Sequence, residues 1–200
     1  MFYVVRHGLT DFYMQNICQS QENNPINEVG VVQANELAEK IKRIKFNFFI
    51  SSDLLRARQT AEIVNKSFKM EIIYDKRLRE RLTGVFGGKP KDLVPCEIKN
   101  DALVNAHKYG GETFEDVYIR VKNFYDDMKL NKINNALVIA HSNSIRILKF
   151  IVAGYKWSNE DYNYFLTTLN PINPTDIFEL DFYHSHKTYY NSKETNEGLC

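Results

Sequence analysis

The chain has 200 residues, of which 44% are hydrophobic and 26% charged, and its formal net charge is only +1. This length and composition are typical of one globular domain, which we expect to span residues 1–190, followed by a mobile tail at residues 191–200. The balanced charge gives no reason to expect nucleic acid or a membrane surface as partner. No apolar run approaches the roughly 20 residues of a spanning helix, and we find no secretory signal, so we expect a cytoplasmic protein.

Apolar strands and amphipathic helices alternate along the chain. Asn27 is a suitable N-cap for the first long helix, and the T-x-x-D spacing of Thr113 and Asp116 is a helix-start signal. In chain order we predict a strand at 2–5, a helix at 27–44, a strand at 46–50, a helix opening at 51–53, a strand at 71–74, a short helix near 96–108, a helix from 113, a strand at 136–140, a helix at 143–152 and an antiparallel edge strand at 176–182.

Strands that are apolar on both faces and alternate with helices indicate a mostly parallel sheet with helices on both sides. We therefore expect a three-layer α/β/α sandwich. Ligands of such sheets bind beyond the carboxyl ends of the strands. Polar residues follow all four parallel strands, and we expect them to meet in one site: Arg6, His7 and Gly8; Ser51 and Ser52; Arg79 and Glu80; His141 and Ser142.

These residue types suit a tetrahedral dianion such as a phosphoryl group. Arg6 and Arg56 offer planar donors of fixed charge that match phosphate oxygens. A neutral imidazole can attack phosphorus to form phosphohistidine, and a carboxylic acid such as Glu80 can protonate the departing oxygen. We find no metal-ligand cluster and predict no cofactor.

Six segments between Phe2 and about Val152 resemble, in order, those of the histidine phosphatase superfamily, in the branch related to cofactor-dependent phosphoglycerate mutase. The resemblance implies a phosphoglycerate mutase-like fold. The segments are VVRHGLT, PINEVGVVQANELAEKI, SSDLLRARQTAEIV, RLRERLTGVFGGK, GGETFEDVYIRV and LVIAHSNSIR.

The resemblance also implies a role for each catalytic residue. His7 is the expected nucleophile, and Arg6 and Arg56 bind the phosphoryl oxygens. His141, protonated or hydrogen-bonding, stabilises the developing charge. Glu80 protonates the leaving group and then activates water, with Glu112 as the alternative acid. The expected substrate-binding residues are Arg6, Arg56, Gly8, Asn16, Ser142 and Glu112.

Two positions depart from the family pattern. Tyr13 stands where the family often has an asparagine that contacts phosphate, and Asn16 is the predicted substitute. Ser142 stands where glycine usually follows the second histidine. These changes affect substrate preference and rate more than reaction class. The lysines between the acid segment and the glycine loop either form a solvated face or attract a second anionic group: Lys89, Lys91, Lys99 and Lys108.

The sequence leaves three functions open. Mutases of the family carry a longer insertion than the stretch between Gly88 and Gly110, so the main prediction is a metal-independent phosphomonoester hydrolase. Its expected substrate is a small phosphorylated metabolite, of the sugar phosphate or glycolytic acid type. The alternatives are a phosphoglycerate mutase and a catalytically silent phosphate-binding module. The oligomeric state is open, and a dimer could form through the edge strand.

Overall fold

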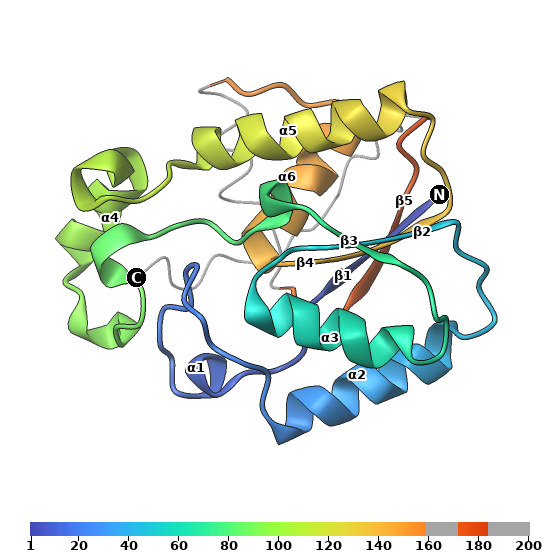
Figure 1. Ribbon diagram of the computed structural model, residues 1–200. Coiled ribbons are helices and arrows are strands. Elements are labelled where there is room, and N and C mark those ends of the chain that lie inside the picture. The colour runs from blue at the N-terminus through green and yellow to red at the C-terminus, as the bar shows by residue number, and fades with distance from the viewer. Residues whose placement is uncertain (159–171, 184–200) are drawn as a thin grey trace, which may run out of the picture.

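The computed structural model describes residues 1–158 and 172–183, which form a five-stranded sheet between two layers of helices (Figure 1). The strand order is β3-β2-β4-β1-β5. All neighbouring strands run parallel except β5, which is antiparallel to β1 at the sheet edge. The predicted fold class is confirmed. The strands are β1 (Phe2–Arg6), β2 (Phe48–Ser51), β3 (Ile72–Tyr74), β4 (Ala136–Ala140) and β5 (Ile177–Leu180).

Two pairs of helices cover the two faces of the sheet (Figure 1). The helices α2 (Glu28–Ile41) and α3 (Leu55–Asn65) cover one face, and α5 (Phe114–Leu130) and α6 (Ser142–Val152) cover the other. The shorter helices α1 (Asp11–Met14) and α4 (Cys96–Val104) lie to the side, beyond the carboxyl edge of the sheet.

Alternate residues of the central strand β4 enter two separate cores. Val138 packs in the cluster that contains the apolar residues of α5 and α6, and its neighbours Leu137 and Ile139 pack against α2 and α3. Every residue of this strand is buried. The continuous apolar sequence of the parallel strands therefore follows from helices on both faces.

The predicted helix starts are correct at two places. The Asn27 side chain accepts a hydrogen bond from the backbone N–H of Gly30 at 2.9 Å. Thr113 and Asp116 form a reciprocal capping box, in which Thr113 Oγ1 accepts from the Asp116 N–H and the Asp116 carboxylate accepts from the Thr113 N–H. Both caps satisfy N–H groups that a helix start would otherwise leave unpaired.

The predicted start of α3 is wrong. The helix begins at Leu55 rather than at residues 51–53, and its N-cap, Leu54, makes no side-chain cap bond. Ser52 is buried and its hydroxyl contacts His141 instead. The short helix predicted near 96–108 is divided into α4 and a 3₁₀ turn at Ala106–Tyr109.

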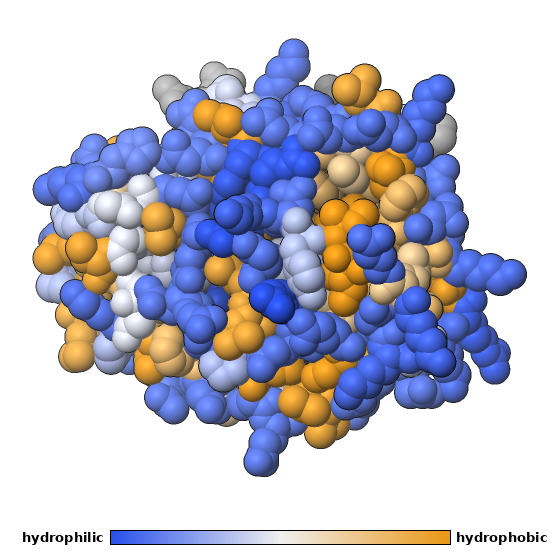
Figure 2. All heavy atoms as spheres, viewed as in Figure 1, coloured by the Kyte–Doolittle hydropathy of each residue, from blue (hydrophilic) through white to orange (hydrophobic). Residues whose placement is uncertain are grey.

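The remaining features of the fold concern its surface and the predicted C-terminal tail. Polar side chains cover most of the face seen in Figure 2, and apolar side chains gather beside edge strand β3, where Ile73 and Tyr74 are exposed. Within residues 1–158 and 172–183, no helix is both long and apolar enough to cross a membrane. The tail predicted at residues 191–200 lies outside the described residues.

Candidate active site

The sheet brings the ends of three strands together. β4 lies between β1 and β2, and Arg6 at the end of β1 is opposite Ala140 at the end of β4. The backbone N–H of His7 continues this pairing and donates to the carbonyl of Ala140 at 3.1 Å. As a result, the buried rings of His7 and His141 lie 5.0 Å apart, centroid to centroid.

The hydrogen bonds of His7 define its tautomer. Arg56 Nε donates to His7 Nε2 at 3.2 Å, and a guanidinium cannot accept, so Nε2 carries the lone pair. The other nitrogen, Nδ1, then carries the proton and donates to the Gly8 carbonyl at 2.8 Å. Burial, followed by the charges of Arg56 and Arg6, lowers the pKa of His7 well below 6.5. His7 is therefore neutral near pH 7, and its unprotonated nitrogen is Nε2, the atom that accepts from Arg56.

Arg56 is fully buried and is held mainly by neutral oxygens. Its terminal nitrogens donate to Asn24 Oδ1 at 2.8 Å and to the carbonyls of Glu22 and Ser20 at 3.2 and 2.7 Å. Burial lowers the pKa of Arg56 to about 10, which still leaves it charged at neutral pH. No described carboxylate lies within ion-pair distance, so its charge remains available to an anion.

Arg6 is the second guanidinium beside His7. It is 6% exposed, and its Nη1 donates to the carbonyl of Ile172. Its Nε is buried and has no hydrogen-bond partner among the described residues. The ring of Tyr13 packs against the guanidinium, 4.9 Å from Arg6 Cζ. The unusual Tyr13 therefore contacts a phosphate-binding candidate directly.

His141 is fully buried at the start of α6. Its Nε2 lies 2.8 Å from Ser52 Oγ, and its Nδ1 has no partner among the described residues. Burial and the nearby charge of Arg56 lower the pKa of His141 well below 6.5, so it is neutral in the ligand-free protein. Donation by Ser52 to Nε2 would leave Nδ1–H directed to a ligand.

Glu80 approaches this group from the segment after β3. Its Oε1 accepts from the backbone N–H of Arg81 at 2.8 Å and from that of Asn143, in the first turn of α6, at 3.3 Å. Its charge raises the pKa values of Arg6 and Arg56 against the effect of burial. The carboxyl group is thus close enough to act electrostatically on both buried cations without forming an ion pair with them.

Glu112, the alternative acid, is already paired. Its carboxylate accepts from Arg120 at 2.8 and 3.0 Å and from the Leu82 N–H at 2.8 Å. Arg120 also donates to the Glu80 carbonyl at 3.1 Å. This arrangement favours Glu80 as the acid and gives Glu112 and Arg120 the task of holding the Glu80 segment. Sequence reasoning did not identify Arg120.

The backbone of Gly8 makes two hydrogen bonds within the protein. Its N–H donates to Thr60 Oγ1 at 3.0 Å and its carbonyl accepts from His7, so neither group is free for a ligand. A Cβ atom at this position would lie 2.7 Å from the Gly30 carbonyl oxygen. Gly8 therefore allows the loop to pack against α2 and helps to orient the ring of His7.

The remaining candidates are less buried than the residues around His7. Asn16 is exposed, and its side-chain amide donates to Asp92 Oδ1 at 2.7 Å. Ser142 opens α6 and is partly buried. Lys89 and Lys91 are exposed, and Lys108 pairs with Asp101 at 2.8 Å. The side chain of Lys99 lies outside the described part of the structure.

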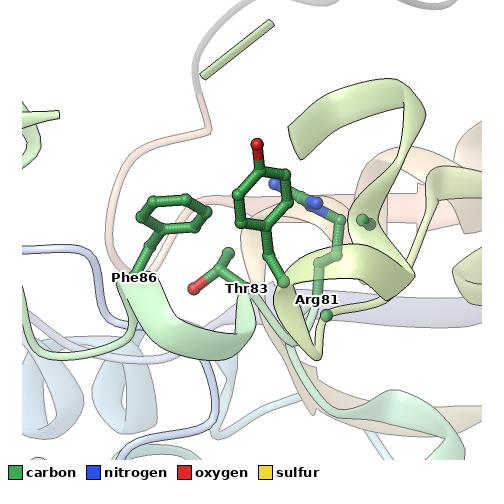
Figure 3. A pocket seen from close by; sticks show the side chains of 6 residues that line it. Arg81, Thr83 and Phe86 are labelled. Atoms are coloured by element: carbon green, nitrogen blue, oxygen red, sulfur yellow. The ribbon is translucent and has the colours of Figure 1, made fainter. Parts of the chain in front are cut away.

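A small pocket adjoins the acid segment (Figure 3). Arg81, Thr83 and Phe86 line it from the stretch directly after Glu80, and Tyr109 contributes a ring 5.2 Å from that of Phe86. The pocket therefore offers aromatic surface close in sequence to Glu80. Among residues 1–158 and 172–183, no group of three or more His, Cys, Asp and Glu side chains could hold a metal ion.

Fold and site together define a class of protein. The site holds a neutral imidazole beside two guanidinia and a second imidazole, at the carboxyl edge of an α/β sheet. This combination is typical of enzymes that transfer phosphoryl groups through histidine. The model of the histidine phosphatase superfamily (branch 1) matches residues 2–188, and the chain belongs to this family.

Several known proteins are similar to this chain. Fructose-2,6-bisphosphatase TIGAR of Xenopus tropicalis is 35% identical over 130 residues, which cover 62% of this chain and 47% of that protein. "Probable phosphoglycerate mutase GpmB" of Enterobacter sp. (strain 638) is 31% identical over 76% of this chain and 74% of its own. The structure of mycobacterial glucosyl-3-phosphoglycerate phosphatase with VO3 has a TM-score of 0.73 at 21% identity, covering 88% of both chains. The matched region spans about half of the TIGAR relative.

Proposed function

We propose that the protein is a phosphomonoester hydrolase that acts on a small phosphorylated metabolite through a phosphohistidine at His7. The observation that carries this proposal is the bond from Arg56 Nε to His7 Nε2, because its acceptor must be an unprotonated nitrogen and its donor is a cation whose bond a phosphoryl oxygen can take over. A phosphoryl group bound there would have its oxygens beside Arg56 and its phosphorus beside the nucleophile. We further propose a cytoplasmic location, because the family relatives act on metabolites.

The proposed reaction has two steps. His7 Nε2 attacks phosphorus, the ester bond breaks, and Glu80 donates its proton to the departing oxygen. A water molecule then gives a proton back to Glu80 and attacks the phosphohistidine, which releases inorganic phosphate and restores neutral His7. Arg6, Arg56 and the Nδ1–H of His141 stabilise the charge on the phosphoryl oxygens in both steps.

A direct test is the hydrolysis of p-nitrophenyl phosphate in the presence of a chelator. We expect His7→Ala to lose roughly 10⁴-fold or more in kcat, because the nucleophile is removed. Labelled phosphate should be trapped on His7 of the wild type by rapid acid-free quenching. A wild type without activity, or a fully active His7→Ala, contradicts the proposal.

The mutase is the second candidate, since GpmB relatives match 76% of the chain. It predicts interconversion of phosphoglycerates that depends on a bisphosphorylated primer. Free phosphate as the main product argues against it. The silent binding module is tested by the same trapping experiment, because it forms no phosphohistidine.

A further inference from the structure

Asn24 is a buried side chain that holds the cation beside the nucleophile. It is 3% exposed, and its Oδ1 accepts from Arg56 Nη1 at 2.8 Å. Arg56 also donates to two backbone carbonyls and to His7 Nε2, so among the described residues Asn24 supplies the one side-chain oxygen that holds it. An amide oxygen carries no net charge, so this hydrogen bond orients the guanidinium without neutralising it.

The hydrogen bonds around Asn24 can be assigned outward from Arg56. A guanidinium only donates, so the atom that faces Arg56 is Asn24 Oδ1 and the amide nitrogen points the other way. That nitrogen, Nδ2, donates to Gln19 Oε1 at 3.0 Å, and the same oxygen accepts from Thr10 Oγ1 at 3.1 Å. The orientation of the Asn24 amide is therefore fixed by hydrogen bonds at both of its ends.

The same network reaches the second cation of the site. Thr10 is fully buried, and its Oγ1 accepts from the Tyr13 N–H at 3.2 Å at the start of α1. The Tyr13 ring packs against the guanidinium of Arg6. The chain between residues 10 and 24 therefore contacts both guanidinia through neutral groups, an aromatic ring at Arg6 and an amide at Arg56.

The charges around Arg56 show why a neutral side chain matters at position 24. Arg56 is fully buried, and Glu80 acts on it only through space, without an ion pair. Asparagine and aspartate have nearly the same shape. A carboxylate in place of the Asn24 amide would lie within hydrogen-bond distance of Arg56 and would neutralise it before a phosphoryl group arrives.

We propose that Asn24 is a positioning residue that orients Arg56 and keeps its positive charge free for the phosphoryl group of the substrate. This inference rests on the proposed function and deepens it, because it assigns the residue that prepares the phosphate-binding cation. The side-chain hydrogen bonds of Asn24 go to Arg56 and Gln19, so it acts on the phosphoryl group through Arg56.

Asn24→Asp separates position from charge, because the carboxylate keeps an oxygen opposite Arg56 and adds a counterion. Rotation of the Gln19 amide would let its nitrogen donate to the new carboxylate. Titration calorimetry with inorganic phosphate measures binding without any turnover. We expect the dissociation constant for phosphate to rise by about tenfold to a hundredfold, because the carboxylate competes with the anion for Arg56. KM for p-nitrophenyl phosphate should rise with it.

Thermal unfolding supplies the readout that a merely structural role would not give. The melting temperature of Asn24→Asp should stay the same or rise, because the buried cation gains a partner. If Asn24 only held the loop together, stability and phosphate affinity would fall together.

Two further variants control the result. Asn23→Asp places the same charge on the neighbouring residue, which is exposed, and should change the dissociation constant by less than about threefold. Asn24→Ala removes the oxygen that orients Arg56, and it should raise the dissociation constant by about threefold to tenfold and lower the melting temperature.

The inference is overturned if Asn24→Asp binds phosphate as tightly as the wild type, if it loses stability and affinity together, or if Asn23→Asp weakens binding as much. If Asn24→Asp does not fold, Asn24→Ala decides, and unchanged phosphate affinity in that variant overturns the inference. A wild type that hydrolyses nothing but binds phosphate with this dependence on Asn24 supports the inference and contradicts the proposed function. Intact hydrolysis with phosphate binding that is independent of Asn24 has the opposite meaning.

Discussion

Two groups of arginines in this protein have opposite surroundings. Arg77 and Arg79, near Glu80 in sequence, pair with Asp75 and Asp53 at 2.7 and 2.5 Å, and these carboxylates raise their pKa values. The two arginines of the site, Arg6 and Arg56, have no carboxylate within ion-pair distance among the described residues, and burial lowers their pKa values.

The difference separates charges that hold the structure from charges reserved for a ligand. A paired arginine is neutralised locally and fixes the segment that carries it. A buried arginine without a counterion costs several kcal/mol of stability unless an anion arrives. We infer that the first group positions the Glu80 segment, while the second awaits a phosphorylated substrate. Replacing one arginine of each group by glutamine tests whether the two groups have these different roles.

The largest expected effect is on kcat, which should fall strongly in Arg56→Gln and change little in Arg77→Gln. Arg56→Gln should lower kcat by about 10³-fold, because it removes the cation bonded to the nucleophile. Arg77→Gln should leave kcat within about threefold and lower the free energy of unfolding by about 1 kcal/mol, since its ion pairs are partly exposed. Steady-state kinetics and urea unfolding measure both. Equal losses of kcat in the two variants contradict the division.

A smaller effect is expected from the two carboxylates of the same region. Glu80→Gln should lower kcat by about 10²-fold to 10³-fold on an alkyl phosphate, whose leaving group needs a proton, and by less on p-nitrophenyl phosphate. Glu112→Gln should mainly reduce stability, because its partner Arg120 would lose an ion pair of 2.8 Å. The reverse pattern, with kcat dependent on Glu112, would assign the acid to the paired residue.

The sequence contains enough information to predict the sheet and the convergence of its strand ends. β4 matches its predicted limits because all five residues are apolar and both faces are covered. His7 and His141 follow strands that are hydrogen-bonded neighbours, so parallel pairing brings them together without further information. The order of the strands in the sheet makes β1 and β4 neighbours, and local sequence patterns do not predict this order.

Contacts between distant loops could not be predicted in this way. Asn24, which holds Arg56 at 2.8 Å, belongs to a segment with no periodic pattern. Gly8 suggested close approach by a ligand, but the close neighbour is the backbone of Gly30. Asn16 was expected at the site from its helical spacing, but it has a φ of 53° after the short α1 and turns to Asp92. Each outcome depends on tertiary packing rather than local sequence.

The smallest expected effect is on the pH dependence of the free energy of unfolding, which should differ between the buried site and the region of the paired arginines. Burial, and after it the charges of the nearby arginines, lowers the pKa values of His7 and His141 in the folded state. Below pH 6.5 the unfolded chain therefore binds more protons, and stability is lost as the pH falls. The loss has an upper limit of about 1.4 kcal/mol per pH unit for each histidine. Arg79 also lowers the pKa of Asp53, but that contribution is present above 3.8 and is lost only at lower pH.

Urea unfolding at several pH values between about 7.5 and 4.5 measures the histidine contribution, with His141→Asn and Asp53→Asn as paired variants. His141→Asn should flatten the loss of stability below pH 6.5, because it removes one of the two buried imidazoles. Asp53→Asn should shift the curve by a similar amount at every pH in this range, because the Asp53 carboxylate remains charged throughout. A slope that His141→Asn leaves unchanged would mean that the folded protein does not hold this buried imidazole neutral, and the two regions would then differ in the surroundings of their arginines alone.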